Sequence, residues 1–133
     1  MSQIEKKVDY TKWNINGLQL QLDMQDAVVA ERYEAALAAL GETEKNLPKT
    51  GTLSERIRAF CSMFRCFFDH IFGEGTAQQI FGDSYNAREH GEVYENFLEF
   101  VSNQRGSLDD LGNRLSSRYS PNRAQRRAIS RVK

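Results

Sequence analysis

The side chains best suited to chemistry in this chain are two cysteines and two histidines: Cys61, Cys66, His70 and His90. Cys66 and His70 stand four residues apart, a spacing that places two metal ligands on one face of a helix. Structural zinc sites show a second closely spaced pair, and Cys61 and His90 do not form one. We therefore expect no metal site and no cofactor.

The two cysteines are expected to be free thiols. Five residues apart on a helix, Cys61 and Cys66 would have Cα atoms about 8 Å apart, beyond the ~7 Å that a disulfide spans. Cys61 falls on the apolar side of the helical wheel and Cys66 on the polar side.

Acidic and basic side chains adjoin at Asp69-His70 and at Glu89-His90, which suggests acid–base catalysis. Neighbours on a helix point about 100° apart, and neither a nucleophile nor a phosphate-binding glycine motif accompanies the pairs. We expect both pairs to be solvated surface and the protein not to be an enzyme.

A wide aromatic face marks the helix expected to start at Leu53. Six of the eight phenylalanines lie between Ile57 and Gly82, and the apolar arc of this helix covers about half of its circumference, wider than the ~100° that one-sided packing needs. Two interpretations stay open, a core covered by the rest of the chain or the floor of a groove for an apolar partner segment. The candidate partner-binding residues are Phe60, Phe64, Phe67, Phe68 and Phe72, with Phe81 and Tyr85 near the rim.

Charge is unevenly distributed along the chain. Residues 1–104 hold 10 Lys and Arg against 16 Asp and Glu (net −6), whereas residues 105–133 hold 8 against 2 (net +6). The predicted basic tail carries Arg123, Arg126, Arg127, Arg131 and Lys133. It could contact phosphates, but it lacks an aromatic residue for base stacking, so an acidic protein partner or simple solubility explains it better than nucleic acid.

An N-terminal β-hairpin is predicted over about residues 6–23. Leu18, Leu20 and Leu22 alternate with polar residues, and Asn16-Gly17 favours a tight turn. The partner strand would come from Val8, Tyr10, Trp13 and Ile15. A lone hairpin is marginal in water, so it must pack on helices or add strands from another subunit.

Helix start and stop signals divide the rest of the chain, after the hairpin, into separate elements. Thr52 and Glu55 have the spacing of a capping box, and glycines follow each apolar run. The expected elements are a helix over 25–40 ending at Gly41, a connector over 41–51, the aromatic helix ending at Gly73, a short turn from Gly75 to Gly82, a long helix from Asn86 to a break near Gly106, and a short helix capped by Ser107 with Leu108, Leu111 and Leu115.

The sequence thus predicts a mainly α (α+β) fold, in which a small N-terminal β-hairpin packs on a bundle of about four helices. We expect one domain over residues 1–119 and a basic flexible C-terminal tail over 120–133. No apolar run approaches the ~20 residues of a membrane span, and the first residues have no apolar core of the kind a secretion signal requires. We therefore expect a cytoplasmic protein without a membrane partner.

Several segments resemble small tail-assembly proteins of long-tailed phages and prophages of Gram-positive bacteria. The resemblance covers about residues 12–127 and is carried by INGLQLQLD (15–23), DA (26–27), ERYEAAL (31–37), FFD (67–69), IFGEGT (71–76) and IFG (80–82). The segment NRAQRRA (122–128) is also similar to the C-terminal tails common in small phage proteins.

This resemblance implies a tail assembly chaperone in the host bacterial cytoplasm. Such a protein coats the apolar helices of the tape measure protein until tail-tube subunits displace it. The partners implied are the tape measure protein and the tail-tube protein. Apart from this resemblance, we also expect that the chain can associate with further copies of itself. Two alternatives remain open: a nucleic-acid-associated or regulatory protein acting through its basic tail, and a virion connector or tail-completion component.

Overall fold

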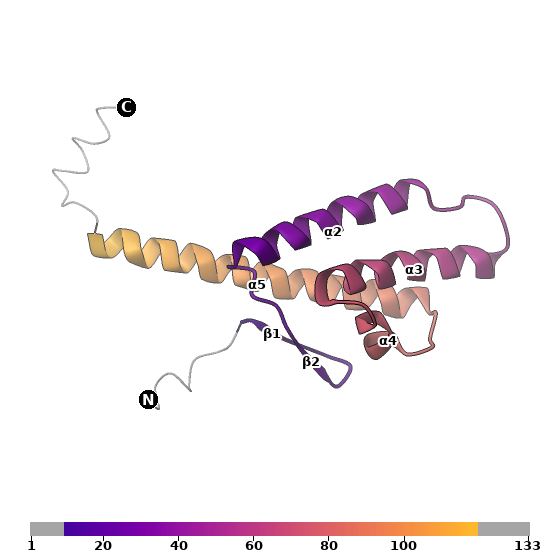
Figure 1. The fold of residues 1–133 in the computed structure, drawn as a ribbon, viewed down its shortest axis with the longest axis horizontal. Helices are drawn as coiled ribbons and strands as arrows, with labels where there is room; N and C mark the ends of the chain where they lie inside the picture. The colour runs from indigo at the N-terminus through magenta and orange to yellow at the C-terminus, as the bar shows by residue number, and fades with distance from the viewer. Residues whose placement is uncertain (1–9, 120–133) are drawn as a thin grey trace.

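The computed structural model describes residues 10–119 (Figure 1). The elements are β1 (Lys12–Ile15), β2 (Leu18–Gln21), α2 (Ala27–Lys45), α3 (Leu53–Phe72), α4 (Thr76–Phe81) and α5 (Ala87–Tyr119). The fold is mainly α with a small two-stranded hairpin before the helices, so the predicted fold class is confirmed. The predicted tail over 120–133 and the start of the predicted hairpin, including Val8, lie outside the described residues.

The hairpin forms at the predicted turn. β1 and β2 pair antiparallel, with Trp13 opposite Leu20 and Ile15 opposite Leu18. Asn16 and Gly17 both have positive φ values, 49° and 81°, as a two-residue hairpin turn requires. Tyr10, which was expected to belong to the first strand, precedes it and is exposed.

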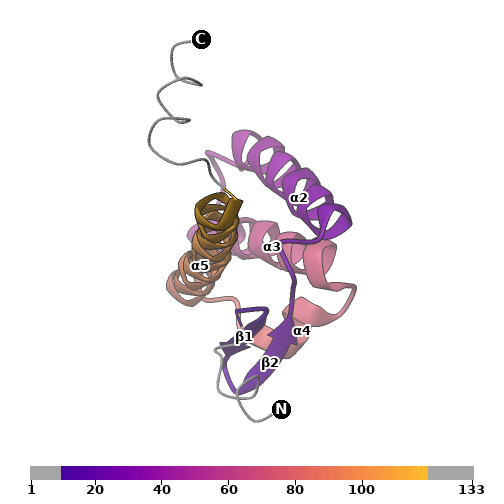
Figure 2. The same ribbon diagram turned by 90° about the vertical axis from the view of Figure 1, so that its left-hand side faces the viewer.

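α3 is the central element of the helical layer. The predicted capping box is present at its start, where Thr52 Oγ1 accepts from Glu55 N and the Glu55 carboxylate accepts from Thr52 N. The helix ends before Gly73, as predicted. α2 and α5 pack against α3 from different sides, while the hairpin lies against α5 on the side of α4 (Figure 2).

Aromatic rings join the hairpin and the two longest helices in one core. Trp13 stacks on Phe68 with ring centroids 5.6 Å apart and meets Phe97 edge-on at 5.2 Å. Its indole Nε1 donates to Asn96 Oδ1 (2.8 Å), so the one polar atom of this buried ring is satisfied. The hairpin therefore has the helical support that it needs, from its own chain.

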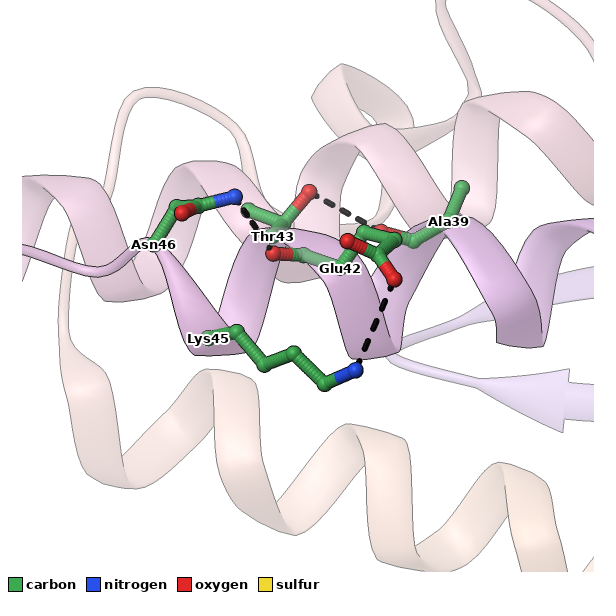
Figure 3. A network of polar contacts seen from close by, with 5 residues as sticks. All are labelled: Ala39, Glu42, Thr43, Lys45 and Asn46. Carbon is green, nitrogen blue, oxygen red and sulfur yellow. Dashed lines mark hydrogen bonds and ion pairs between the residues drawn. The ribbon is translucent and has the colours of Figure 1, made fainter.

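α2 does not stop at Gly41, so the predicted boundary was wrong. The helix continues to Lys45 and ends where Asn46 Nδ2 donates to Glu42 O (3.0 Å), two residues before Pro48 (Figure 3). A helix-interior glycine costs only about 1 kcal/mol relative to alanine, and packing on α3 offsets this cost. Gly41 has no positive φ that would turn the chain.

α5 likewise runs through Gly106 to Tyr119, so the predicted break and the separate helix capped by Ser107 were wrong. Gly106 keeps a negative φ, and no proline interrupts α5. The last third of α5 extends past the beginning of α2, away from the other helices (Figure 1).

The core position of Phe68 can be tested by truncation. We expect Phe68→Ala to lower the free energy of unfolding by about 3–5 kcal/mol, because it removes a fully buried ring. The control, Leu53→Ala, removes a side chain that is 72% exposed and should change stability by only about 0.5 kcal/mol. Urea denaturation followed by circular dichroism measures both, and equal losses would contradict the core assignment.

Candidate protein-binding site

The seven aromatic residues predicted to bind a partner occupy three kinds of position. Buried in the core are Phe64, Phe67, Phe68 and Phe81. Phe60 and Phe72 are partly buried and pack against that core, and Tyr85 is exposed. In the folded chain most of this face of α3 is therefore covered by α2, α5 and the hairpin, so a partner could not reach it.

An open groove lies on another side of α3, between this helix and the C-terminal half of α2. Its wider part is a hollow of about 450 Å³ lined by Glu42, Thr43, Asn46, Leu47, Pro48, Ala59, Ser62, Met63 and Cys66. It continues into a hollow of about 60 Å³ lined by Ala36, Ala39, Leu40, Thr43, Met63, Cys66, Phe67 and His70. We call these two connected hollows the α2–α3 groove.

Small side chains on both helices keep this groove open. α2 contributes Ala36, Ala39 and Thr43, and α3 contributes Ala59, Ser62 and Cys66, so each row has the spacing i, i+3, i+7 of one helix face. The buried side chains of Met63 and Phe67 form the floor. A side chain from outside can therefore reach apolar atoms without displacing any part of the fold.

The polar groups at the end of α2 are engaged within the helix itself (Figure 3). Thr43 Oγ1 donates to Ala39 O (3.0 Å), and Lys45 Nζ lies 3.5 Å from Glu42 Oε1 at the exposed rim. The Asn46 amide also bonds back to α2, through Glu42 O. Because these groups already have partners, the groove presents mainly carbon and sulfur atoms to a visiting chain.

Both cysteines are free thiols, as predicted, and Cys66 is exposed in the groove. Cys61 is buried on the other side of α3, where burial raises the pKa of its thiol.

A buried polar cluster, which the sequence did not reveal, joins α3 to the turn before α5. Arg65 Nε donates to His90 Nε2 (3.2 Å), and Arg65 Nη2 donates to Gly82 O (2.7 Å) and Ser84 O (2.6 Å). The guanidinium also lies 4.2 Å from the centroid of the Tyr85 ring. Carbonyl oxygens and ring faces thus compensate this buried charge.

His90 is fully buried, so its expected place on the solvated surface was wrong. Its Nδ1 lies 2.8 Å from Asn86 O, which can only accept, so Nδ1 carries the proton and Nε2 is free to accept from Arg65. Burial lowers the pKa of His90, and the neighbouring Arg65 charge acts in the same direction. The neutral imidazole is a structural link and has no open path to a substrate.

Asp69 and His70, the other adjacent acidic and basic residues, have different surroundings. Asp69 Oδ1 accepts from Ala77 N (2.8 Å) near the start of α4, whereas His70 is exposed at the narrow end of the groove. Asp69 is therefore a local structural acceptor and was wrongly expected to be solvated surface.

Within residues 10–119, no group of three or more His, Cys, Asp or Glu side chains is placed to hold a metal ion. Over the same residues, no helix is both long and apolar enough to cross a membrane. We take the α2–α3 groove as the candidate protein-binding site of the described residues.

Residues 16–130 match a family of unknown function, DUF6673. The chain belongs to this family. No curated protein and no solved structure matches the chain.

The buried His90 should make the stability of the DUF6673 protein depend on pH. The unfolded chain takes up a proton on this imidazole near pH 6.5, whereas the folded chain resists protonation until lower pH. Unfolding therefore binds a proton in that window, and stability falls as pH drops below about 6.5, by at most about 1.4 kcal/mol per pH unit.

Urea denaturation at a series of pH values, from above 6.5 downward, measures the contribution of His90 to stability. It is carried out on the wild type and on His90→Gln. We expect the wild type to lose more stability than the variant, whose neutral amide can still accept from Arg65. The exposed His70→Gln variant is the control for removing one histidine. Equal losses in wild type and His90→Gln would show that His90 does not resist protonation in the folded state.

Proposed function

We propose that this protein is a non-catalytic tail assembly chaperone that binds apolar helices of a tape measure protein. The observation that supports this best is the α2–α3 groove, an open and mainly apolar channel between two helices. The resemblance of the sequence to phage tail-assembly proteins supplies the class of client. The groove supplies a place where such a client can bind.

The shape of the groove suits a helical partner. An amphipathic helix docks by placing apolar side chains from positions i, i+3, i+4 and i+7 into a groove. The two rows of small residues, with Ala39 and Thr43 on α2 facing Ser62 and Cys66 on α3, let the backbone of a third helix approach both. Met63 on the floor is a flexible, polarizable contact that adapts to different apolar side chains.

The chemistry of the groove also suits temporary binding. Such a groove covers one face of a client and buries less area than a permanent interface of 2,000 Å² or more. Apolar contact without buried charge discriminates little between similar helices, which a chaperone for a long repetitive client requires. The net charge of −6 on residues 1–104 would help to keep the complex dissolved. Tail-tube subunits could then displace the chaperone by competition.

The alternative function through the basic tail depends on Arg123, Arg126, Arg127 and Arg131, which lie outside the described residues. The two functions differ in their response to salt. Phosphate contacts weaken steeply as ionic strength rises, whereas apolar helix capture changes little. A virion connector differs from a chaperone in a further respect, because it stays in the purified particle.

We expect the protein to form a salt-resistant complex with a long coiled-coil protein encoded in its own genome. Ser62→Arg places a long charged side chain in the groove from an exposed position, so it should weaken this complex at least tenfold, about 1.4 kcal/mol, without unfolding the chain. The matched control is Ala35→Arg, an exposed position of α2 that does not line the groove. Co-expression followed by affinity pull-down at low and high salt measures both.

Three outcomes would contradict the proposal. Equal binding by Ser62→Arg and Ala35→Arg would exclude the groove as the site. Recovery of nucleic acid alone, lost at high salt, would favour the basic tail. Detection of the chain in purified particles would favour a virion component.

A further inference from the structure

The last third of α5 has no cover within the described part of the chain. From Arg105 to Ser116 every residue whose side chain is described is exposed, including Leu108 (50%), Leu111 (37%) and Leu115 (45%). We call residues 106–119 the α5 extension and these three leucines the leucine stripe. Isolated helices of this length are marginal in water, and the glycines at 106 and 112 weaken this one further.

The stripe continues the buried face of α5 without a change of spacing. Phe97, Val101 and Gln104 face the core, and Leu108, Leu111 and Leu115 follow them at alternating steps of four and three residues. This 4–3 alternation is the pattern by which two helices pair along a seam. Where the extension leaves the core, Leu108 borders a hollow of about 230 Å³ that Tyr33 and Leu37 also line.

We propose that a second copy of this chain covers the leucine stripe, with the two α5 extensions antiparallel and Leu111 of each copy beside Leu115 of the other. This inference goes beyond the proposed function and uses no residue of the α2–α3 groove. It assigns the extension to self-association through a two-fold axis, in which both copies use the same surface.

The position of the core explains the antiparallel arrangement. The rest of the chain covers this same face of α5 as far as Gln104, whose amide accepts from Met24 N (2.7 Å) and donates to Leu22 O (2.7 Å). Two parallel extensions would bring both cores to the same end and the same side, where they would collide. Antiparallel extensions place the cores at opposite ends.

Charge favours a second copy as the occupant. The extension carries Asp109, Asp110, Arg114 and Arg118, so it has no net charge and does not repel itself, although residues 1–104 carry −6. On one flank of the stripe, the antiparallel pair gathers Asp110 and Arg114 of both copies, a group of two acidic and two basic side chains without net charge. These two residues also line a hollow of about 560 Å³, which leaves room for the incoming side chain. Gly112, on the other flank, lets the two backbones approach.

The size of the surface limits the strength of this dimer. Three half-exposed leucines and their flanks bury less on two copies than the roughly 1,200 Å² of the smallest stable interfaces. The dimer should therefore be weak, so that monomer and dimer exchange as the concentration changes.

Sedimentation equilibrium of the full chain over a wide concentration range tests the proposal. We expect a monomer–dimer equilibrium in the wild type and an increase of at least tenfold in its dissociation constant for Leu111→Glu. Leu53→Glu, at an exposed apolar position of α3, is the control and should keep the wild-type constant. Far-ultraviolet circular dichroism confirms that both variants are folded. A wild type that is monomeric throughout, or equal weakening by both variants, would overturn the proposal.

Disulfide trapping tests the direction and register. Leu111→Cys and Leu115→Cys are made separately in a Cys66→Ser background, one of them with a mass tag, then mixed and oxidised. For an antiparallel pair, we expect disulfides between Leu111→Cys and Leu115→Cys to form faster than disulfides between two copies of the same variant. Faster joining of each variant to itself would show a parallel pair and overturn the arrangement.

Discussion

The wide aromatic face of α3 needs cover from several directions, and the rest of the fold is arranged to supply it. Phe67 and Phe68 are adjacent on α3 and both are buried, and more than one element contributes a ring to their cover. Trp13 from the hairpin reaches Phe68, while Phe97 from α5 contacts both rings. α2 adds Tyr33 against Phe97. Hairpin, α2 and α5 thus share one core because one helix presents too much apolar surface for any of them alone.

The same constraint explains why one side of α3 stays open. The large rings occupy the arc that faces the hairpin and α5, and the small residues Ala59, Ser62 and Cys66 occupy the arc next to the C-terminal half of α2. Neighbouring small residues on α2 cannot fill the space between the two helices. The groove is therefore a consequence of how side-chain size is distributed around α3, and it requires no moving part.

Local signals in the sequence predicted most of the fold. The capping box at Thr52 and the Asn16-Gly17 turn act through a few adjacent residues, so their structures follow from the sequence directly. The ends of α2 and α5 could not be predicted from such local signals, because tertiary packing decides whether a helix continues through a glycine.

The candidate site was harder to predict than the fold. The pairing of Arg65 with His90 spans 25 residues and depends on a turn that no local pattern announces. The spacing of small residues at 59, 62 and 66 was visible in the sequence, but the aromatic residues on the same helix gave the stronger signal. Residue types alone do not show which of two apolar faces a neighbouring element covers.

The contacts between the two ends of the described chain affect how the protein is made on the ribosome. Trp13 depends on Asn96 and Phe97, and the backbone after the hairpin is held by Gln104. The hairpin is thus synthesised well before α5, which supplies its binding surface. Until α5 has left the exit tunnel, the indole ring and the aromatic face of α3 lack the cover that Phe97 supplies. Nascent chains of this protein would expose part of that surface until α5 is made, a period in which general chaperones can bind them.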